Sequence, residues 1–154
     1  MPSLTNKERV GRALDLVAEG LGPWMANLLQ RKYGPNWPAQ VRAAAGAQRD
    51  FPDDPNDPSY LFWVFDKQWV SLFKLHASHA DRRAVSGLWD ARKTWAHGGR
   101  FSDDQTERAL SDAESLLRSI GAVTQADQVD TMRRDLRRIR FEKDQQRSRE
   151  AVER

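Results

Sequence analysis

Arg92 and His97 stand five residues apart in the segment DARKTWAHGGR, and their side chains suit the cleavage of RNA. A guanidinium binds phosphate oxygens through charge-assisted hydrogen bonds, and an imidazole gains and loses a proton near neutral pH. The 2′-hydroxyl of RNA supplies the nucleophile, so this chemistry needs neither a metal ion nor a cofactor. We therefore interpret His97 as the acid–base group and Arg92 as the group that stabilises the charge of the transition state.

Three neighbouring residues extend this candidate site. We expect Asp90 to be a third catalytic residue, whose carboxylate orients the other groups. Lys93 and Arg100 are cationic and flank the motif, so we expect them to bind RNA through accessory phosphate contacts.

The spacing of Arg92 and His97 on a helix predicts a site that two chains share. Residues five apart on an ideal helix differ by about 140° in direction and about 7.5 Å in height, so one chain aligns the two side chains poorly. A two-fold axis beside the helix end would bring a second Arg92 and His97 to the same groove. The two His97 rings would then lie on the order of 7–12 Å apart, with Gly98 and Gly99 keeping the groove open.

Arg92 also falls on the same helical stripe as Val85, Leu88 and Trp95, which are expected to be buried. A guanidinium at a seam between helices needs an anion, because burial of an unpaired charge is costly. The candidates are a carboxylate, either Asp90 of a second copy or a residue of the acidic loop described below, and a bound phosphate.

The helices that must position these residues begin and end at local signals. Thr5 and Glu8 form a capping box that opens the first helix. The segment EGLGPW at 19–24 is expected to break it, with Pro23 in the first turn of a second helix. A short third helix is expected around Trp37.

The central part of the chain is first acidic and then aromatic. Residues 46–59 contain three prolines and four aspartates, which predicts a long loop, either a surface connection or a lid. An aromatic helix is expected from Tyr60 to about Ala77. A helix with so wide an apolar surface is either central or buried in a partner, and we expect it to associate with a second copy. Its apolar residues are Leu61, Phe62, Trp63, Phe65, Trp69, Leu72 and Phe73.

Three more helices are expected after the aromatic segment. The first covers roughly 80–97, and the second begins at a capping box of Ser102 and Gln105 and is closed by Gly121. A long charged helix follows at 124–154. We thus predict an all-α bundle of four to five main helices, with a domain at 1–140 and a charged helical extension at 141–154.

Composition excludes several classes of protein. The longest apolar run, YLFWVF at 60–65, is far shorter than the roughly 18 residues of a membrane span, so we expect no membrane partner. Cysteine is absent, which excludes disulfides and thiolate catalysis and fits the cytoplasm. The net charge is +3 with a pI near 9.5, and most basic residues are arginine. This bias favours nucleic acid or another charged partner, or reflects the codons of a GC-rich genome.

Two further sets of residues have the types that bind metal ions. His76 and His79 could form half a metal site, but no third ligand is evident, and histidines at helix ends are the simpler interpretation. Asp103, Asp104 and Asp112 could bind a divalent ion. Asp103 and Asp104 are more simply acids in the first turn of a helix, where they favour its dipole.

The segment LWDARKTWAHGGRFSDDQTERAL at 88–110 resembles the HEPN superfamily. The most similar branch is attached to large bacterial ATPases and defence proteins, and it is related to a HEPN region in a eukaryotic nuclear RNA quality-control endonuclease. Segments at 13–25 and 69–73 also resemble earlier helices of that branch, so the resemblance covers most of residues 8–140. The positions that follow the pattern are Asp90, Arg92, Trp95, Ala96, His97, Phe101, Ser102, Arg108, Ala109 and Leu110.

The resemblance implies an all-α bundle that dimerises, and a metal-independent endoribonuclease that leaves a 2′,3′-cyclic phosphate. It also implies a setting in defence or stress response, with RNA, a second copy, and a larger ATPase or an antitoxin-like protein as partners. Other members have lost catalysis and only bind RNA or a partner, which is the second hypothesis here. Lys93 stands where the family commonly has a small polar residue such as Asn, and lysine cannot accept a hydrogen bond as Asn can.

Overall fold

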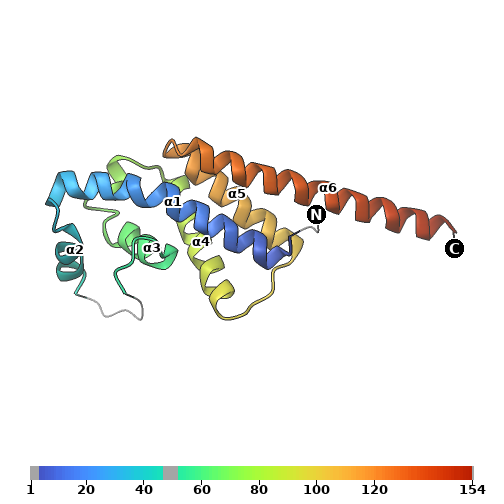
Figure 1. Cartoon of the computed structure of the whole chain (residues 1–154), viewed down its shortest axis with the longest axis horizontal. Coiled ribbons are helices and arrows are strands. Elements are labelled where there is room, and N and C mark those ends of the chain that lie inside the picture. Colours follow the sequence, from blue (N-terminus) through green and yellow to red (C-terminus); the bar gives the residue numbers. More distant parts are fainter. Residues whose placement is uncertain (1–3, 47–51, 154) are drawn as a thin grey trace.

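The computed structural model describes residues 4–46 and 52–153, which form six α-helices, one 3₁₀ helix and no strand (Figure 1). The predicted all-α bundle with a long C-terminal helix is therefore confirmed. In chain order the elements are α1 (Asn6–Tyr33), α2 (Trp37–Ala45), α3 (Pro58–Lys67), η1 (Phe73–Leu75), α4 (His79–Ala96), α5 (Asp103–Ser119) and α6 (Val123–Glu153).

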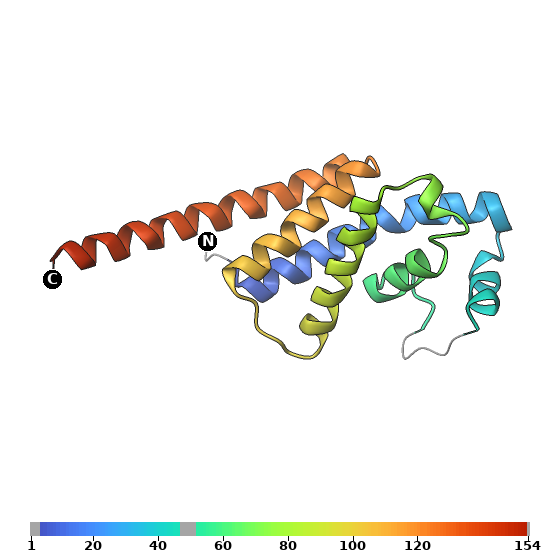
Figure 2. The same ribbon diagram turned by 180° about the vertical axis from the view of Figure 1, so that it is seen from behind.

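The four long helices make one core. Helix α5 packs against α1, α4 and α6, while α2 and α3 lie beside the C-terminal half of α1 (Figures 1 and 2). The stripe of α5 that faces the core repeats every three to four residues, as in an amphipathic helix. It consists of Ala109, Leu110, Ala113, Leu116 and Leu117, all buried.

Helix α1 is continuous, and the expected break at 19–24 is wrong. Pro23 lies inside the helix, and Gly20 serves close packing there. A Cβ atom on Gly20 would lie 2.6 Å from Cδ2 of Leu117 and 2.8 Å from Cβ of Ala122, so a larger residue would require the end of α5 and the link to α6 to shift. Burial of the apolar side chains on both sides of Pro23 offsets the hydrogen bond that proline cannot donate.

The aromatic helix is shorter than expected, because α3 ends at Lys67. The amide of Trp69 donates to the carbonyl of Asp66 and the amide of Phe73 to that of Gln68, three and five residues back, so turns replace the regular helical pattern. The Gln68 side chain is itself buried and accepts a hydrogen bond of 2.7 Å from the Tyr33 hydroxyl. The turns fold the chain back, and the Phe73 ring stacks on Phe65 with 5.1 Å between ring centroids.

The aromatic surface of this segment is central to the chain's own fold. The side chains that we expected to drive association are at most 6% exposed, so they offer no surface to a second copy. They are Leu61, Phe62, Trp63, Phe65 and Trp69. Among the large apolar residues nearby, Val70 and Leu75 are the exposed ones.

Local signals placed most helix ends correctly. The capping boxes at Thr5 and Ser102 are both present, and Gly121 closes α5 with a φ of 82°. A third capping box, between Ser78 and Asp81, opens α4.

The acidic segment at 46–59 is described only in part, because residues 47–51 lie outside the described residues. Residues 52–57 form an irregular link to α3, and Asp53 in this link pairs with Arg42 of α2.

Helix α6 projects beyond the rest of the fold (Figure 1). Its last buried residue is Leu136, and every described residue from Phe141 onward is exposed. None of the described helices combines the length and the apolar character that a membrane crossing requires.

Candidate active site at the C-terminal end of α4

The candidate motif lies where α4 ends, as the sequence predicts. His97 is the C-terminal cap of α4, and its amide donates to the carbonyl of Lys93 over 3.2 Å. Gly98 then takes a φ of 72°, a conformation that glycine adopts without strain. The amide of Gly99 donates back to the carbonyl of Thr94 over 2.8 Å, so the turn that follows His97 is well defined.

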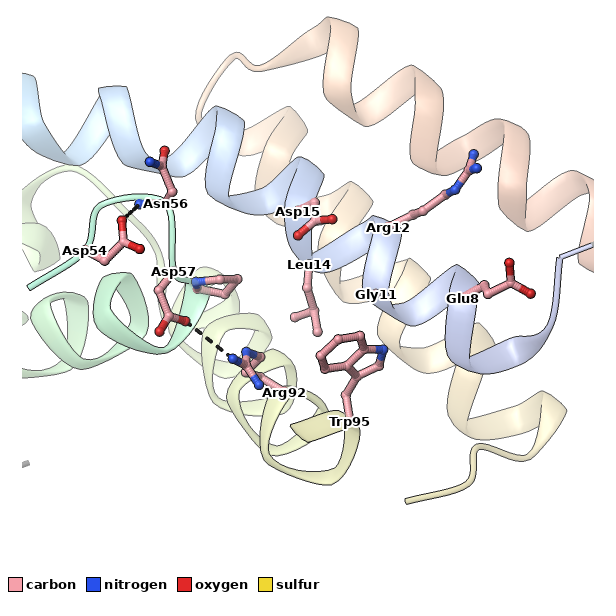
Figure 3. Close-up of a pocket in the computed structure, with 11 residues that line it drawn as sticks. Glu8, Gly11, Arg12, Leu14, Asp15, Asp54, Asn56, Asp57, Arg92 and Trp95 are labelled. Carbon is pink, nitrogen blue, oxygen red and sulfur yellow. Dashed lines mark hydrogen bonds and ion pairs between the residues drawn. The ribbon is translucent and has the colours of Figure 1, made fainter. Parts of the chain in front are cut away.

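Arg92 points from α4 toward α1 and the start of α3, and it pairs with Asp57 (Figure 3). The distance from Nη2 of Arg92 to Oδ1 of Asp57 is 3.7 Å, and the two side chains are 23% and 21% exposed. Among the anions that we considered for this arginine, the structure places a carboxylate of the acidic loop beside it. On its other side, the guanidinium carbon lies 5.5 Å from the centre of the Trp95 ring.

Asp57 and Trp95 are each held in place by a hydrogen bond. Asp57 is the N-cap of α3, where its Oδ1 accepts a hydrogen bond of 2.9 Å from the amide of Ser59. The Trp95 indole N–H donates to the carbonyl of Lys7 over 3.1 Å. Both neighbours of Arg92 are therefore positioned by contacts that do not involve Arg92.

A cavity of about 480 Å³ opens beside Arg92 and carries more acidic than basic side chains. Among the basic residues that line it, Arg92 points toward Asp57, whereas the Arg12 side chain extends toward α6 (Figure 3). The electrostatic potential around Arg92 is therefore negative, although the chain has a net charge of +3. The residues that line the cavity are Glu8, Gly11, Arg12, Leu14, Asp15, Asp54, Asn56, Asp57, Pro58, Arg92 and Trp95.

His97 is exposed and does not line this cavity. Its imidazole makes no hydrogen bond or ion pair with any residue of the described ranges 4–46 and 52–153. One chain thus presents Arg92 to the cavity and His97 at the exposed end of α4, in different directions, as the helical spacing predicts.

Asp90 lies on the flank of α4 that faces α5, away from the cavity that contains Arg92. It lines a separate hollow of about 200 Å³ together with Asp112 and Arg108. Burial raises the pKa of Asp112, and the nearby Arg108 opposes this rise only in part. Within one chain the structure therefore does not bring Asp90 to Arg92.

The two predicted phosphate contacts are both accessible. Lys93 is exposed, and its Nζ lies 4.7 Å above the centre of the Trp89 ring. Arg100 is exposed in the link between α4 and α5. Neither residue lines the cavity beside Arg92.

The two histidines considered as metal ligands lie at helix ends. His76 caps η1, and His79 begins α4 with its ring 5.9 Å from that of Trp69. Across the described ranges, no group of three or more His, Cys, Asp or Glu residues is arranged to hold a metal ion.

The acids of the first turn of α5 have protein partners. A hydrogen bond of 2.9 Å from Asn6 lowers the pKa of Asp103, and Asp104 accepts one of 2.8 Å from Arg140. Asp112 lies half a revolution away on the same helix, because nine residues turn an α-helix by about 900°.

Asp57 is the member of this site that sequence reasoning did not single out. The order Asp57–Pro58 is a recognisable start of a helix, with a capping residue followed by proline. That signal predicts the cap but not the contact with Arg92, which depends on how α3 packs against α4.

An all-α bundle with Arg92 and His97 at the exposed end of α4 has the features of a HEPN domain. A family model described as Swt1-like HEPN matches residues 12–121, a range that contains the whole motif. The chain therefore belongs to the Swt1-like HEPN family, and the resemblance noted from the sequence is confirmed. No curated protein and no solved structure shows a significant match to the chain.

Proposed function

We propose that this chain is an endoribonuclease that cleaves RNA without a metal ion. The observation that carries the proposal is the position of Arg92 and His97 at the open end of α4, within the residues that match the HEPN family. Arg92 borders a cavity and His97 is exposed, so both are accessible to an RNA strand. The second hypothesis, a non-catalytic module, is considered last.

The proposed reaction is an internal transfer within RNA. A His97 imidazole removes the proton of the 2′-hydroxyl, and the 2′-oxygen attacks the adjacent phosphorus. The bond from phosphorus to the 5′-oxygen breaks, and this oxygen takes a proton from an imidazolium. The products are a 2′,3′-cyclic phosphate and a free 5′-hydroxyl. Arg92 stabilises the negative charge that grows on the phosphoryl oxygens, with Lys93 and Arg100 holding flanking phosphates.

We further propose that two chains build each site. On α4, the side chains of Arg92 and His97 point in different directions and lie at different heights along the helix axis. A second copy related by a two-fold axis would supply the arginine or histidine that one chain does not bring to the same place. One His97 would act as the base and the other as the acid. Asp90 would orient groups across the interface, because its own chain does not place it beside Arg92.

The first test is cleavage of a labelled single-stranded RNA in EDTA. We expect His97→Ala to reduce the rate by about 10²–10⁴, the usual contribution of acid–base catalysis. The matched control is His76→Ala, which removes another exposed histidine outside the site. If His97→Ala is folded and cleaves as fast as the parent, the assignment is wrong.

Mixed dimers test whether the site is shared. We expect equal amounts of Arg92→Ala and His97→Ala chains to cleave faster together than either variant does alone, since the mixed dimer retains one Arg92 and one His97. The mixture should remain slower than the parent, because the mixed dimer lacks the second His97 that serves as base or acid. Activity of the mixture equal to the mean of the two separate variants would contradict a shared site.

The second hypothesis is a non-catalytic HEPN module that binds RNA or docks onto a larger ATPase or an antitoxin-like protein. Lys93 favours it, because it replaces the Asn that is common in the family. Helix α6 favours it too, since Phe141 is 63% and Val152 86% exposed on the segment 141–154, which we propose as an extension of a domain at 1–140. Either function would suit a defence or stress system in the cytoplasm. RNA binding without cleavage by the parent would support this hypothesis.

A further inference from the structure

Arg92 is held by charge and by an aromatic ring rather than by hydrogen bonds. Its 3.7 Å separation from Asp57 exceeds hydrogen-bond range, and the Trp95 ring contributes a cation–π contact. Its guanidinium donates no hydrogen bond to any residue that the structure describes. Within residues 4–46 and 52–153, no protein group therefore occupies the N–H donors that would bind a phosphate.

Asp57 is fixed more firmly than Arg92. The oxygen that faces Arg92 is the same Oδ1 that caps α3, and the side chain is only 21% exposed. Asp54 and Asp15 line the same cavity, so the carboxylate of Asp57 does not act alone. A phosphate that approaches Arg92 from this side meets a negative field.

These contacts give Asp57 two effects that both weaken the binding of an anionic ligand to Arg92. Its charge restrains the guanidinium, and the same charge repels a phosphate that comes within a few ångströms. An ion pair without a hydrogen bond is weak, whereas a phosphate can accept two parallel hydrogen bonds from a guanidinium. A well-placed phosphate can therefore separate the pair.

We propose that Asp57 restrains Arg92 in the free protein, and that an RNA phosphate must displace this carboxylate to bind Arg92. The proposal rests on the proposed action on RNA, and it makes Asp57 a positioning residue that limits the affinity for phosphate. The proposal also predicts that the site prefers RNA to inorganic phosphate. An RNA strand that is held by further basic side chains can displace Asp57 more readily than inorganic phosphate can.

The test compares binding of a labelled single-stranded RNA by the parent and by Asp57→Asn. Asparagine caps a helix as well as aspartate does, so this change removes the charge and keeps the start of α3. We expect RNA to bind about three- to tenfold more tightly at low salt, as expected for the loss of one nearby negative charge. If Asp57→Asn does not fold, Asp57→Ser offers a second neutral cap.

The matched control is Asp66→Asn. Asp66 pairs with Arg82, another arginine of α4, at the same distance of 3.7 Å. We expect this variant to bind RNA within about twofold of the parent, since the neutralised charge lies at the other end of α4. An equal gain in both variants would overturn the proposal, because it would reflect net charge alone.

A second background shows whether Asp57 acts through Arg92. In chains that carry Arg92→Ala, we expect Asp57→Asn to change RNA affinity by less than about twofold, because without Arg92 no phosphate is held close enough to be repelled by Asp57. A full three- to tenfold gain in this background would overturn the proposal. An unchanged or weakened affinity of Asp57→Asn in the parent background would overturn it as well.

One measurement without RNA separates this proposal from the proposed function. We expect solvent exchange of the Arg92 Nε–H, followed by NMR, to be several-fold faster in Asp57→Asn than in the parent. Equal exchange would overturn the restraint, even if RNA binds. Absence of RNA binding by the parent, with faster exchange in the variant, would contradict the proposed function and leave the restraint supported.

Discussion

Two clusters of the same three residue types lie at opposite ends of α4, and they differ in burial. In each, the arginine is 3.7 Å from a carboxylate of α3 or its N-cap, and its guanidinium lies over a tryptophan ring, at 5.2 Å in one and 5.5 Å in the other. The N-terminal cluster consists of Arg82, Asp66 and Trp69, and the C-terminal cluster consists of Arg92, Asp57 and Trp95.

We propose that the two clusters divide a structural role and a ligand-binding role between the two ends of α4. In the N-terminal cluster the charged side chains are 46% and 48% exposed, while the tryptophan is 4% exposed and belongs to the core. In the C-terminal cluster the charges are half as exposed and the tryptophan is only partly buried beside an open cavity. The same contacts therefore predict a structural role at one end and a ligand-binding role at the other.

The largest expected contrast is in stability. Trp69→Ala should lower the free energy of unfolding by about 3–5 kcal/mol, because it empties a core position that packs against Phe65. Trp95→Ala should cost about 1–2 kcal/mol, since its ring is only partly buried. Urea denaturation of both variants measures the difference, and equal losses would contradict the division.

The arginines should show the reverse order in cleavage of RNA. Arg92→Ala should lower the rate by about 10²–10³, which corresponds to loss of one group that stabilises transition-state charge. Arg82→Ala should change it by less than about threefold, apart from a small general effect of charge. Rates at several salt concentrations measure both effects. A greater loss for Arg82→Ala would place the site at the other end of α4.

The carboxylates should differ in stability by a smaller amount. Asp57→Ala should cost about 0.5–2 kcal/mol because it removes the N-cap of α3, whereas Asp57→Asn should cost only a few tenths. Asp66 is exposed in the last turns of α3, so Asp66→Ala should change stability by less than about 0.5 kcal/mol. Thermal unfolding of the three variants checks this order, and a large loss in Asp66→Ala would remove the contrast.

The smallest expected effect is on the stability of a variant at Asp112. This residue of α5 is a third carboxylate that lies against α4. Burial raises the pKa of Asp112, so the folded chain holds this proton more strongly than the unfolded chain does. Its ionisation therefore lowers stability as the pH rises from about 4, the ordinary range of an aspartate. Asp112→Asn should be slightly more stable than the parent at pH 7, and this gain should vanish below about pH 4. A variant that is less stable at pH 7 would show that Arg108 outweighs burial there.

Much of the fold was predictable from the sequence, because short-range signals control it. The capping boxes at Thr5 and Ser102 and the glycines after His97 depend on residues a few positions apart. The break expected at Pro23 was wrong, since the local preference of proline was weaker than the packing of α1. The aromatic helix was extended too far, because helical spacing alone does not predict the turn at Gln68.

The sequence by itself determined that the chain is an all-α HEPN domain and that Arg92 and His97 stand near the end of one helix. Only the tertiary structure decided that Asp57 faces Arg92, that Asp90 faces α5 instead, and that the aromatic side chains fill the chain's own core. The physical reason is the separation along the sequence of the residues that interact. Caps and helical stripes arise from residues within a turn or two of each other, whereas the partner of a side chain on a helix face depends on which distant segment packs there.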